Sequence, residues 1–323
     1  MKRFLKNIGY FVLPIMFLSY AADVFLSSKL KESKTHAGGE YSTWSDLYKG
    51  NLNANILIYG SSRAQVHVSP LIISDSLGRS CYNLGLTGHN FWAQYFRHKE
   101  LLKYNAKPVL IIHSVDVWTL VKREDLFNPD QFLPYMLFNH SIATFTDAYI
   151  GYTTVDFWVP LIRYYGKKVA ILHTIKNLFV SQPKRAGRTR GYEGKQATWN
   201  NDLVDAQASL NTIDLKIDSL TFTLFDRYIK ECQEQKIEII LVYTPEYIEG
   251  QQFVKNRDAI LDTYRYFSTK YGIPFLDYSN DPISVEKEYF YNASHLNKRG
   301  SELFTQKLAQ DIKLLRFRTA EPD

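Results

Sequence analysis

The sequence predicts an α/β protein in which about five parallel strands form one sheet with helices on both faces. Two observations lead to this prediction. Short, uninterrupted apolar runs recur along the chain, as in 56–59 and 236–243, and such runs are typical of strands buried on both faces. Amphipathic segments with helical spacing follow them, for example 91–104 and 253–271. Strands that alternate with helices are joined by right-handed crossovers, which predicts a three-layer α/β/α arrangement.

The composition is that of a globular chain. The 323 residues suffice for one large α/β domain or two small ones, and 23 tyrosines and 20 phenylalanines provide ample material for a core. The formal net charge is +6, but no nucleic-acid-binding motif accompanies it, so we expect no nucleic-acid partner. Cys81 and Cys232 lie in apolar surroundings, which favours two free buried thiols over one disulfide. No Cys/His cluster has metal-ligand spacing, and we predict neither a metal nor another cofactor.

Residues 1–28 are predicted to be a transmembrane anchor or a signal segment. A basic start precedes a mostly apolar stretch at 8–26, interrupted by Pro14 and Asp23, which is just long enough to span a bilayer. Lysines before the stretch favour a cytoplasmic N-terminus, which places the rest of the chain outside, in the periplasm or on the cell surface. There are two alternatives to an anchor. A cleaved signal peptide is one, because residues 19–21 have a small-x-small pattern of the kind found at cleavage sites. A buried amphipathic helix of a cytoplasmic protein is the other. The apolar run continues past that pattern and favours an uncleaved anchor.

Residues 29–53 are polar and contain a glycine pair, which predicts a stalk before a domain at 54–316 and a tail at 317–323. Within the domain, the apolar runs predict strands at 56–59, 80–83, 108–113, 236–243 and 274–276. Helices are expected at 70–77, 91–104, 217–235, 253–271 and 298–315.

The regular alternation stops between 117 and 215, which we interpret as a helical insertion. Residues 126–165 of this insertion are rich in aromatic side chains, which indicates core packing more than a sugar-stacking surface. Residues 181–195 are basic and contain glycine, which indicates a mobile, solvated loop. A site for an anionic substrate or for lipid headgroups is the alternative for that loop.

Three blocks of polar residues follow predicted strands or precede the last helix. They are Gly-Ser-Ser-Arg at 60–63, Asn-Leu-Gly-Leu-Thr-Gly at 83–88 and Asn-Ala-Ser-His at 292–295. A serine hydroxyl becomes a good nucleophile when a base removes its proton, and His295 could be that base for Ser62. Ligands of parallel sheets bind outside the C-terminal ends of the strands. The residues expected at that edge are Ser62, Gly88, Asp116, Thr244 and His295.

Together and in this order, the blocks resemble those of the SGNH (GDSL-type) hydrolase superfamily, and more closely its envelope branch of DltD-like and alginate-acetylation-like proteins. The resemblance covers roughly 54–116 and 236–316. It implies a flavodoxin-like (SGNH) domain in which Ser62 is the nucleophile and His295 is the general base and acid. The backbone N–H groups of Ser62 and Gly88 are then the expected oxyanion hole.

The third block departs from the family pattern at Asn292, which stands in the position of the family's aspartate. An amide oxygen can orient the imidazole of His295, but it cannot supply the charge that stabilises an imidazolium. In a serine-protease triad the equivalent change costs about 10⁴ in turnover. Asp277, Asp281 or Glu288 could supply the acid instead, or a backbone carbonyl could hold the ring. We keep Asn292 among the candidate catalytic residues.

The superfamily's Gly-x-Asn-Asp block has a poor match, because Val115 stands where an asparagine side chain would donate to the oxyanion. Thr87, Asn90 or Ser114 could compensate. Arg63 is expected either to bind an anionic group of the substrate or to form a surface ion pair. The candidate substrate-binding residues are Arg63, Asn83 and Asn90.

Together with these observations, the resemblance implies a membrane-tethered SGNH-type serine esterase or O-acyltransferase that acts on acyl groups of an envelope glycan or related polymer through an acyl-serine intermediate. The expected partners are the acylated substrate, the membrane and envelope-assembly proteins. The alternative is a catalytically inactive SGNH-like binding or assembly protein in cell-envelope polysaccharide export, which the departures at Asn292 and Val115 motivate. Hydrolysis and acyl transfer share the acyl-enzyme, so the sequence leaves the choice between them open, together with the acyl group and the oligomeric state.

Overall fold

The computed structural model describes residues 2–179, 188–208 and 212–318. The chain divides into two compact units. Unit 1 comprises Met1–Asp46 and Glu124–Gly187, and unit 2 comprises Leu47–Arg123 and Arg188–Asp323. Unit 2 contains all three blocks of polar residues that the sequence singles out.

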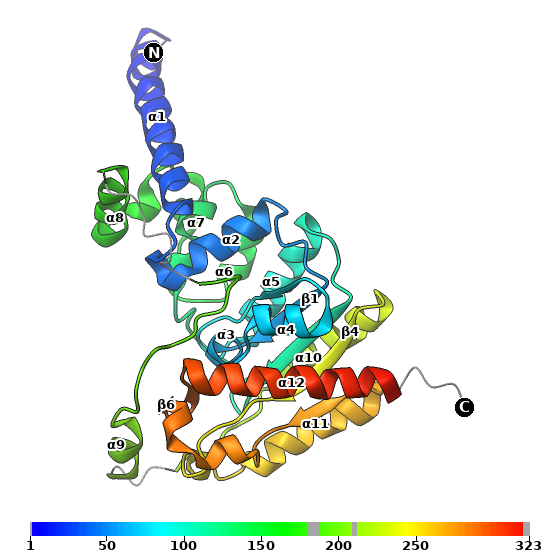
Figure 1. The fold of residues 1–323 in the computed structure, drawn as a ribbon. Coiled ribbons are helices and arrows are strands. Elements are labelled where there is room, and N and C mark those ends of the chain that lie inside the picture. Colours follow the sequence, from blue (N-terminus) through cyan, green and yellow to red (C-terminus); the bar gives the residue numbers. More distant parts are fainter. Residues whose placement is uncertain (1, 180–187, 209–211, 319–323) are drawn as a thin grey trace. The chain divides into compact units, whose positions relative to one another are not determined.

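Unit 2 is built on a five-stranded parallel sheet, which confirms the predicted fold class (Figure 1). The strands are β1 (Ile56–Gly60), β2 (Cys81–Asn83), β3 (Leu110–Val115), β4 (Glu238–Tyr243) and β5 (Phe275–Asp277). Their order in the sheet is β2-β1-β3-β4-β5, and every neighbouring pair is parallel. Gly60 at the end of β1 pairs with Ser114 of β3, so the segments that follow these two strands begin next to each other.

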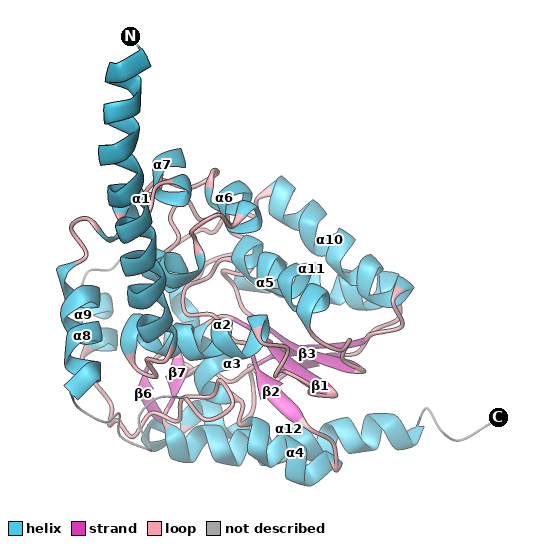
Figure 2. Cartoon of the chain, turned by 90° about the horizontal axis from the view of Figure 1, so that it is seen from above, coloured by secondary structure: helices cyan, strands magenta, loops and turns pink. Residues whose placement is uncertain are grey.

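Helices cover both faces of this sheet (Figure 2). One face carries α3 (Ser62–His67), α4 (Pro70–Leu77) and α12 (Lys298–Arg318), and the other carries α5 (Phe91–Tyr104), α10 (Ser219–Glu234) and α11 (Arg257–Tyr271). Outside the sheet are α9 (Asp202–Ala208), the 3₁₀ helices η4 (Gly250–Phe253), η5 (Pro282–Val285) and η6 (Lys287–Tyr289), and a hairpin of β6 (Phe290–Asn292) and β7 (His295–Leu296). The last helix extends into the predicted tail, of which 319–323 lie outside the described residues.

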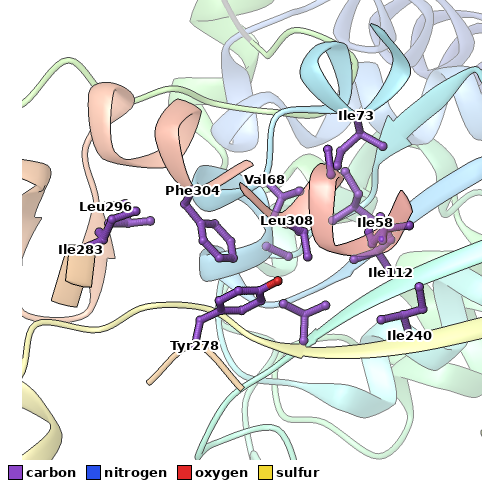
Figure 3. Close-up of a cluster of buried hydrophobic side chains, with 14 of the residues drawn as sticks. Ile58, Val68, Ile73, Ile112, Ile240, Tyr278, Ile283, Leu296, Phe304 and Leu308 are labelled. Carbon is purple, nitrogen blue, oxygen red and sulfur yellow. The ribbon is translucent and has the colours of Figure 1, made fainter. Parts of the chain in front are cut away.

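The alternation of side chains along the strands explains the two helical layers. Ile58 and Ile112 point from neighbouring strands into a cluster in which Phe304 and Leu308 of α12 are also buried (Figure 3). The next residue of β3, His113, points to the other face, where its ring centre lies 5.5 Å from that of Phe225 in α10. Strands that are buried on both faces need apolar residues at successive positions. This is why uninterrupted apolar runs locate them in the sequence.

Unit 1 is helical. Its elements are α1 (Lys2–Lys31), η1 (His36–Gly39), the start of α2 (Glu40–Tyr48), η2 (Pro129–Tyr135), α6 (His140–Thr146), α7 (Thr154–Trp158), η3 (Ile162–Tyr164) and α8 (Lys168–Phe179). Aromatic side chains form much of its core, since Phe132, Phe157 and Tyr164 are all buried. Phe132 lies 5.4 Å from the ring of Trp44. These aromatic side chains therefore pack into a core, as the sequence indicates.

The N-terminal helix α1 contains a segment, Tyr10–Lys31, that is long and apolar enough to cross a membrane. Signal sequences and buried core helices meet the same criterion of length and composition. Asp23, which interrupts the apolar stretch, is buried and accepts hydrogen bonds from the Arg163 guanidinium at 2.6 and 2.7 Å. The charge inside the predicted anchor is thus neutralised within unit 1.

Residues 29–53, predicted to be a stalk, are folded instead. Tyr41, Trp44 and Leu47 recur at helical spacing in α2 and are all buried. This apolar stripe outweighs the polar composition that suggested a stalk. The glycine pair lies in the preceding turn, where Gly38 has a φ of 64°.

The insertion predicted at 117–215 differs from the observed units, because the second segment of unit 1 ends at residue 187. Of the predicted mobile loop, residues 181–187 lie outside the described residues. The described remainder is packed: the carbonyl of Arg190 accepts a hydrogen bond from the N–H of Asn83 at 2.9 Å, at the open edge of β2. The backbone of this loop therefore satisfies a strand edge, which its basic composition does not reveal.

Candidate active site

The turn after β1 gives two neighbouring serines different surroundings. Gly60 ends the strand with a φ of 137°, and a Cβ there would lie 2.4 Å from the carbonyl oxygen of Ser114, so glycine is required. Ser61 caps α3: its hydroxyl accepts a backbone N–H two residues on at 3.3 Å and donates to the buried carboxylate of Asp116 at 2.5 Å. Ser62 is then the first residue of α3 and keeps a partly exposed side chain.

The structure brings Ser62 and His295 together. The Oγ of Ser62 lies 2.8 Å from the Nε2 of His295, although 233 positions separate the two residues. His295 begins β7 directly after the hairpin turn, and its ring stacks on that of Tyr291 at 5.4 Å. Both Ser62 and His295 remain partly exposed, so a substrate can reach them.

Asn292 contacts the other ring nitrogen of the same histidine. Its Oδ1 lies 3.0 Å from the Nδ1 of His295 and also accepts the N–H of Ser294 at 3.1 Å. Its Nδ2 donates to the carboxylate of Asp202 at 3.4 Å. The backbone N–H of Ser294 can only donate, which identifies the amide oxygen of Asn292, and the carboxylate of Asp202 accepts, which identifies its amide nitrogen. Since Oδ1 only accepts, the Nδ1 of His295 carries the proton and Nε2 offers its lone pair to Ser62.

Burial, helped by one nearby positive charge, keeps the ring of His295 neutral at pH 7. Burial and the positive charge of Arg63 lower the pKa of His295 to about 4, although Asp116 and Asp202 act in the opposite direction. A neutral imidazole is the form that can accept a proton from a serine hydroxyl. The same shift makes it a weaker base than an ordinary histidine. A carboxylate in direct contact would raise the pKa, which the neutral amide of Asn292 does not do.

A second histidine, which the sequence analysis missed, supports the site. The Nε2 of His67 accepts the N–H of Leu296 at 3.0 Å, so the proton of this buried ring lies on Nδ1, 2.8 Å from the Oγ1 of Thr244. The two imidazole rings, of His67 and His295, meet edge to face at 6.0 Å. Burial lowers the pKa of His67 well below its usual range, so it remains neutral. It ties α3 to β7 and to the end of β4. The only signal in the sequence is its place on the helix that begins at Ser62.

Arg63 does not form the expected surface ion pair. Its guanidinium is buried, forms an ion pair with Glu246 at 2.8 Å and donates to Thr244 through Nε at 3.2 Å. It also lies over the ring of Tyr243 at 4.6 Å. The partners of Arg63 are therefore buried groups at the end of β4 and just after it, and not a surface carboxylate. Its charge still acts on His295.

Asn83 holds the loop after β2 in place. Its Nδ2 donates to the carbonyls of Ala64 and Val68 at 2.7 and 2.8 Å, and its Oδ1 accepts the N–H of Gly85 at 2.8 Å. Both amide protons are used and the side chain is buried, so the predicted contact with substrate is replaced by a structural role. A Cβ on Gly85 would lie 2.5 Å from the nitrogen of Gln65, which explains the glycine.

The side chains expected to replace the missing asparagine donor are engaged elsewhere or buried. Asn90 caps α5 by accepting a backbone N–H at 3.0 Å through its Oδ1, and its role in substrate binding stays a prediction. Thr87 donates to Gln65 at 2.7 Å. Ser114 and Val115 are buried within β3. Thr87 and Ser114 are therefore not placed as oxyanion donors.

Backbone groups remain the candidates for the oxyanion hole. The N–H of Ser62 belongs to the first turn of α3, where a helix provides no internal acceptor. Gly88 lies in the loop after β2 with a φ of 89°, a conformation that favours glycine. The role of its N–H stays a prediction.

The three carboxylates proposed as the acid of the site have other partners. Each pairs with a basic side chain at 2.9 to 3.0 Å: these are Asp277, Asp281 and Glu288. The carboxylate that does reach the site is Asp202 of α9, through Asn292. Sequence reasoning missed it because it lies 90 positions before Asn292, in a segment without a motif.

The described residues contain no group of three or more His, Cys, Asp or Glu side chains that could hold a metal ion. Both cysteines, Cys81 and Cys232, are free thiols and buried, as predicted.

No protein-family model matches the chain, and no curated protein matches it. Solved structures are similar to it. An acetyl xylan esterase superposes with a TM-score of 0.40 at 12% identity, over 80% of this chain and 99% of that one. A GDSL-like lipase from Bacteroides thetaiotaomicron gives a TM-score of 0.35 at 12% identity, over 80% of this chain and 88% of that one.

Proposed function

We propose that this protein is an SGNH-type serine esterase with Ser62 as its nucleophile. The observation that carries the proposal is the continuous chain of contacts from Ser62 through His295 to Asn292, with separations of 2.8 and 3.0 Å. In such a chain the imidazole takes the proton of the serine while its far nitrogen is held in place. The Asp202 carboxylate extends the chain by one further contact at 3.4 Å.

The reaction has two halves. In the first, the Oγ of Ser62 attacks the carbonyl carbon of an ester while its proton passes to the Nε2 of His295. The tetrahedral intermediate then expels the alcohol, which takes the proton from the imidazolium and leaves an acyl-serine. In the second half, His295 removes a proton from water or from an acceptor alcohol, which attacks the acyl-serine. The oxygen of Ser62 regains a proton, and the product is a carboxylic acid or a new ester.

The charge that develops on the substrate oxygen needs donors fixed in advance. We assign these to the N–H groups of Ser62 and Gly88. Asn292 orients the imidazole of His295 but adds no charge to stabilise the imidazolium. The enzyme is therefore expected to be slow compared with one that has an aspartate at this place, by a factor of up to about 100.

We also propose that the protein is tethered to a membrane and acts on an envelope polymer. The length and composition of Tyr10–Lys31 support a membrane anchor, with unit 2 outside the cytoplasm. The resemblance of the three polar blocks to the envelope branch supports an acylated envelope glycan or related polymer as substrate. Water as acceptor makes the protein a hydrolase, and a sugar hydroxyl makes it an O-acyltransferase.

A second candidate function is a non-catalytic protein of the same fold in envelope polysaccharide assembly. Two observations favour it, the neutral amide of Asn292 and the pKa of about 4 for His295, because both weaken the base. This alternative predicts that Ser62→Ala leaves the biological phenotype unchanged.

The proposal is tested by measuring kcat/KM of the full-length chain for a small activated ester such as 4-nitrophenyl acetate. Ser62→Ala is expected to lower the rate by about 10³-fold or more. Ser294→Ala is the matched control, because it removes an exposed hydroxyl next to His295 that is not bonded to the ring, and it should retain activity. Equal rates in the wild type and Ser62→Ala, with both folded, would contradict the esterase and favour the second candidate.

A further inference from the structure

A pocket of about 390 Å³ lies beside the Asn292–Ser294 turn of unit 2. Its walls come from α9, from the connection between β4 and α11, and from the segment after β3. The lining residues that give it chemical character are Asp202, Leu203, Ile213, Glu246, Phe253 and Arg257. A volume of this size is typical of small-molecule sites, which range over about 300–1,000 Å³.

Arg257 brings hydrogen-bond donors without an acceptor to this pocket. Its side chain is only 12% exposed. Its Nε and Nη2 atoms are buried and have no hydrogen-bond partner in the part of the chain that the structure describes. The ring of Tyr243 lies against the guanidinium at 5.0 Å. A buried, charged donor of this kind requires an acceptor from water or from a ligand.

Glu246 is the nearest buried carboxylate, but other groups already use it. It lies 2.8 Å from the guanidinium of Arg63 and accepts a hydrogen bond from the hydroxyl of Tyr243. Its distance to the Nε of Arg257 is 3.9 Å, and the exposed Asp258 lies 3.8 Å from Nη1, so both are too far for hydrogen bonds. Two arginines therefore share one buried carboxylate, and the donors of Arg257 are left for another anion.

The remainder of the lining is mainly apolar. Leu203 of α9 is buried, and Ile213 and Phe253 add aliphatic and aromatic surface. The other acidic residue of the lining, Asp202, is exposed and already accepts a hydrogen bond from Asn292. Its charge is screened by water but still disfavours a second anionic group. The pocket thus suits a ligand with one negative charge and a short apolar body.

We propose that this pocket binds an organic anion, with its carboxylate paired to Arg257 and its apolar body against Leu203 and Phe253. The planar fork of guanidinium N–H groups matches the two oxygens of a carboxylate. This site goes beyond the proposed function, because binding here does not require Ser62 to act as a nucleophile. The carboxylate could belong to a free organic acid or to an acidic group on the ester substrate itself. The second source is possible because Asn292, which contacts His295, also lines the pocket.

Binding is measured by titrating hexanoate, and hexan-1-ol as its uncharged match, into the full-length Ser62→Ala protein in detergent. We expect hexanoate to bind at least about tenfold more tightly than the alcohol, and Arg257→Gln to remove about that advantage. Arg265→Gln is the matched control on the same helix, because Arg265 is exposed and paired with Asp262 at 2.7 Å. Arg257→Lys keeps the charge without the fork and is expected to bind with intermediate affinity.

Equal affinities for hexanoate and hexan-1-ol would overturn the proposal without any variant of Arg257. The same conclusion would follow if Arg257→Gln and Arg265→Gln, both folded by circular dichroism, bound hexanoate equally well. Because these titrations use the Ser62→Ala protein, a failure of the esterase proposal leaves them unaffected.

The source of the carboxylate is decided by comparing two esters in the otherwise wild-type chain, 4-nitrophenyl hydrogen glutarate and 4-nitrophenyl butanoate. If the substrate carries the anion, Arg257→Gln lowers kcat/KM for the glutarate ester by about tenfold and leaves the butanoate ester unchanged. If only hexanoate binding responds to Arg257→Gln, the ligand is a free organic acid. A change that is equal for both esters, with no change in hexanoate binding, would contradict an anion site.

Discussion

Replacing Asn292 with aspartate tests the electrostatics of the site, and the outcome depends on Asp202. At present one carboxylate lies beyond the amide, and the amide lies 3.0 Å from the Nδ1 of His295. In the wild type, the Nδ2 of Asn292 donates to the carboxylate of Asp202 across 3.4 Å. In the single variant, Asn292→Asp, a second carboxylate takes the place of that donor and faces Asp202. Like charges this close raise the pKa of one carboxyl, so below that raised pKa the pair holds one proton. In that pH range the pair carries the same net charge as the wild-type site, so we expect kcat/KM to change by less than about threefold.

The double variant Asn292→Asp/Asp202→Asn removes this repulsion and moves the single negative charge into contact with the ring. Opposite charges about 4 Å apart attract by about 4 kcal/mol near a protein surface, and such a neighbour shifts a pKa by about 1–3 units. The pKa of His295 should therefore rise from about 4 to roughly 6. A rise of about 2 units stabilises the imidazolium by about 2.7 kcal/mol, which allows a gain in kcat/KM of up to about 100-fold.

The assay is the pH dependence of kcat/KM for 4-nitrophenyl acetate between about pH 4 and pH 9. Activity requires neutral His295, so it falls as the pH drops through the pKa, and the acid limb should move from near pH 4 in the wild type to near pH 6 in the double variant. The reasoning is refuted if the single variant alone gains tenfold or more, because Asp202 would then not face Asn292. It is also refuted if the double variant folds but its acid limb does not move upward.

The same contacts make three other changes informative. Asp202→Asn should lower the pKa of His295, because Asp202 raises it, and reduce kcat/KM at neutral pH by about two- to tenfold; an unchanged pH profile would exclude this contact from the site. Ser61→Ala removes the cap of α3 and leaves the Oδ2 of the buried Asp116 carboxylate without its donor, so urea unfolding should show a loss of about 1–3 kcal/mol, and wild-type stability would contradict that role. Arg63→Met leaves Glu246 with only the Tyr243 hydroxyl and the more distant Arg257, and should cost about 1–3 kcal/mol in the same assay. Normal stability with a raised KM would instead restore Arg63 as a substrate contact.

The sheet and the two reacting side chains could be predicted because their signals are local. Apolar runs mark strands that are buried on both faces, and all five strands overlap the predicted segments. The Gly60 turn and the block ending at His295 carry recognisable residue patterns next to a strand and a helix. A parallel sheet then gathers such segments at one edge, which is why a contact across 233 positions could be anticipated.

The parts that were missed depend on distant partners. From the sequence, Arg63 is expected at the surface or in contact with substrate, because no acidic partner is near it in the chain. Its partner Glu246 follows a different strand and meets it only in the folded protein. Asp202 has no motif around it, and only the folded chain brings it to Asn292. The predicted stalk fails for a different reason: Tyr41 and Trp44 are too few to change the composition of a polar segment, yet they suffice to bury one side of a short helix.

The central claim, that Ser62 is a nucleophile activated by His295, is tested most directly by mass spectrometry after treatment with a fluorophosphonate, a reagent that phosphonylates activated serines. We predict one adduct per chain, located by peptide mapping on Ser62 and not on the neighbouring Ser61. Ser62→Ala should remove the adduct, and His295→Ala should slow its formation by about 10²-fold or more, in line with the contribution of a general base. Absence of an adduct under conditions that fully label a control serine esterase, or an adduct on Ser61 instead, would contradict the account.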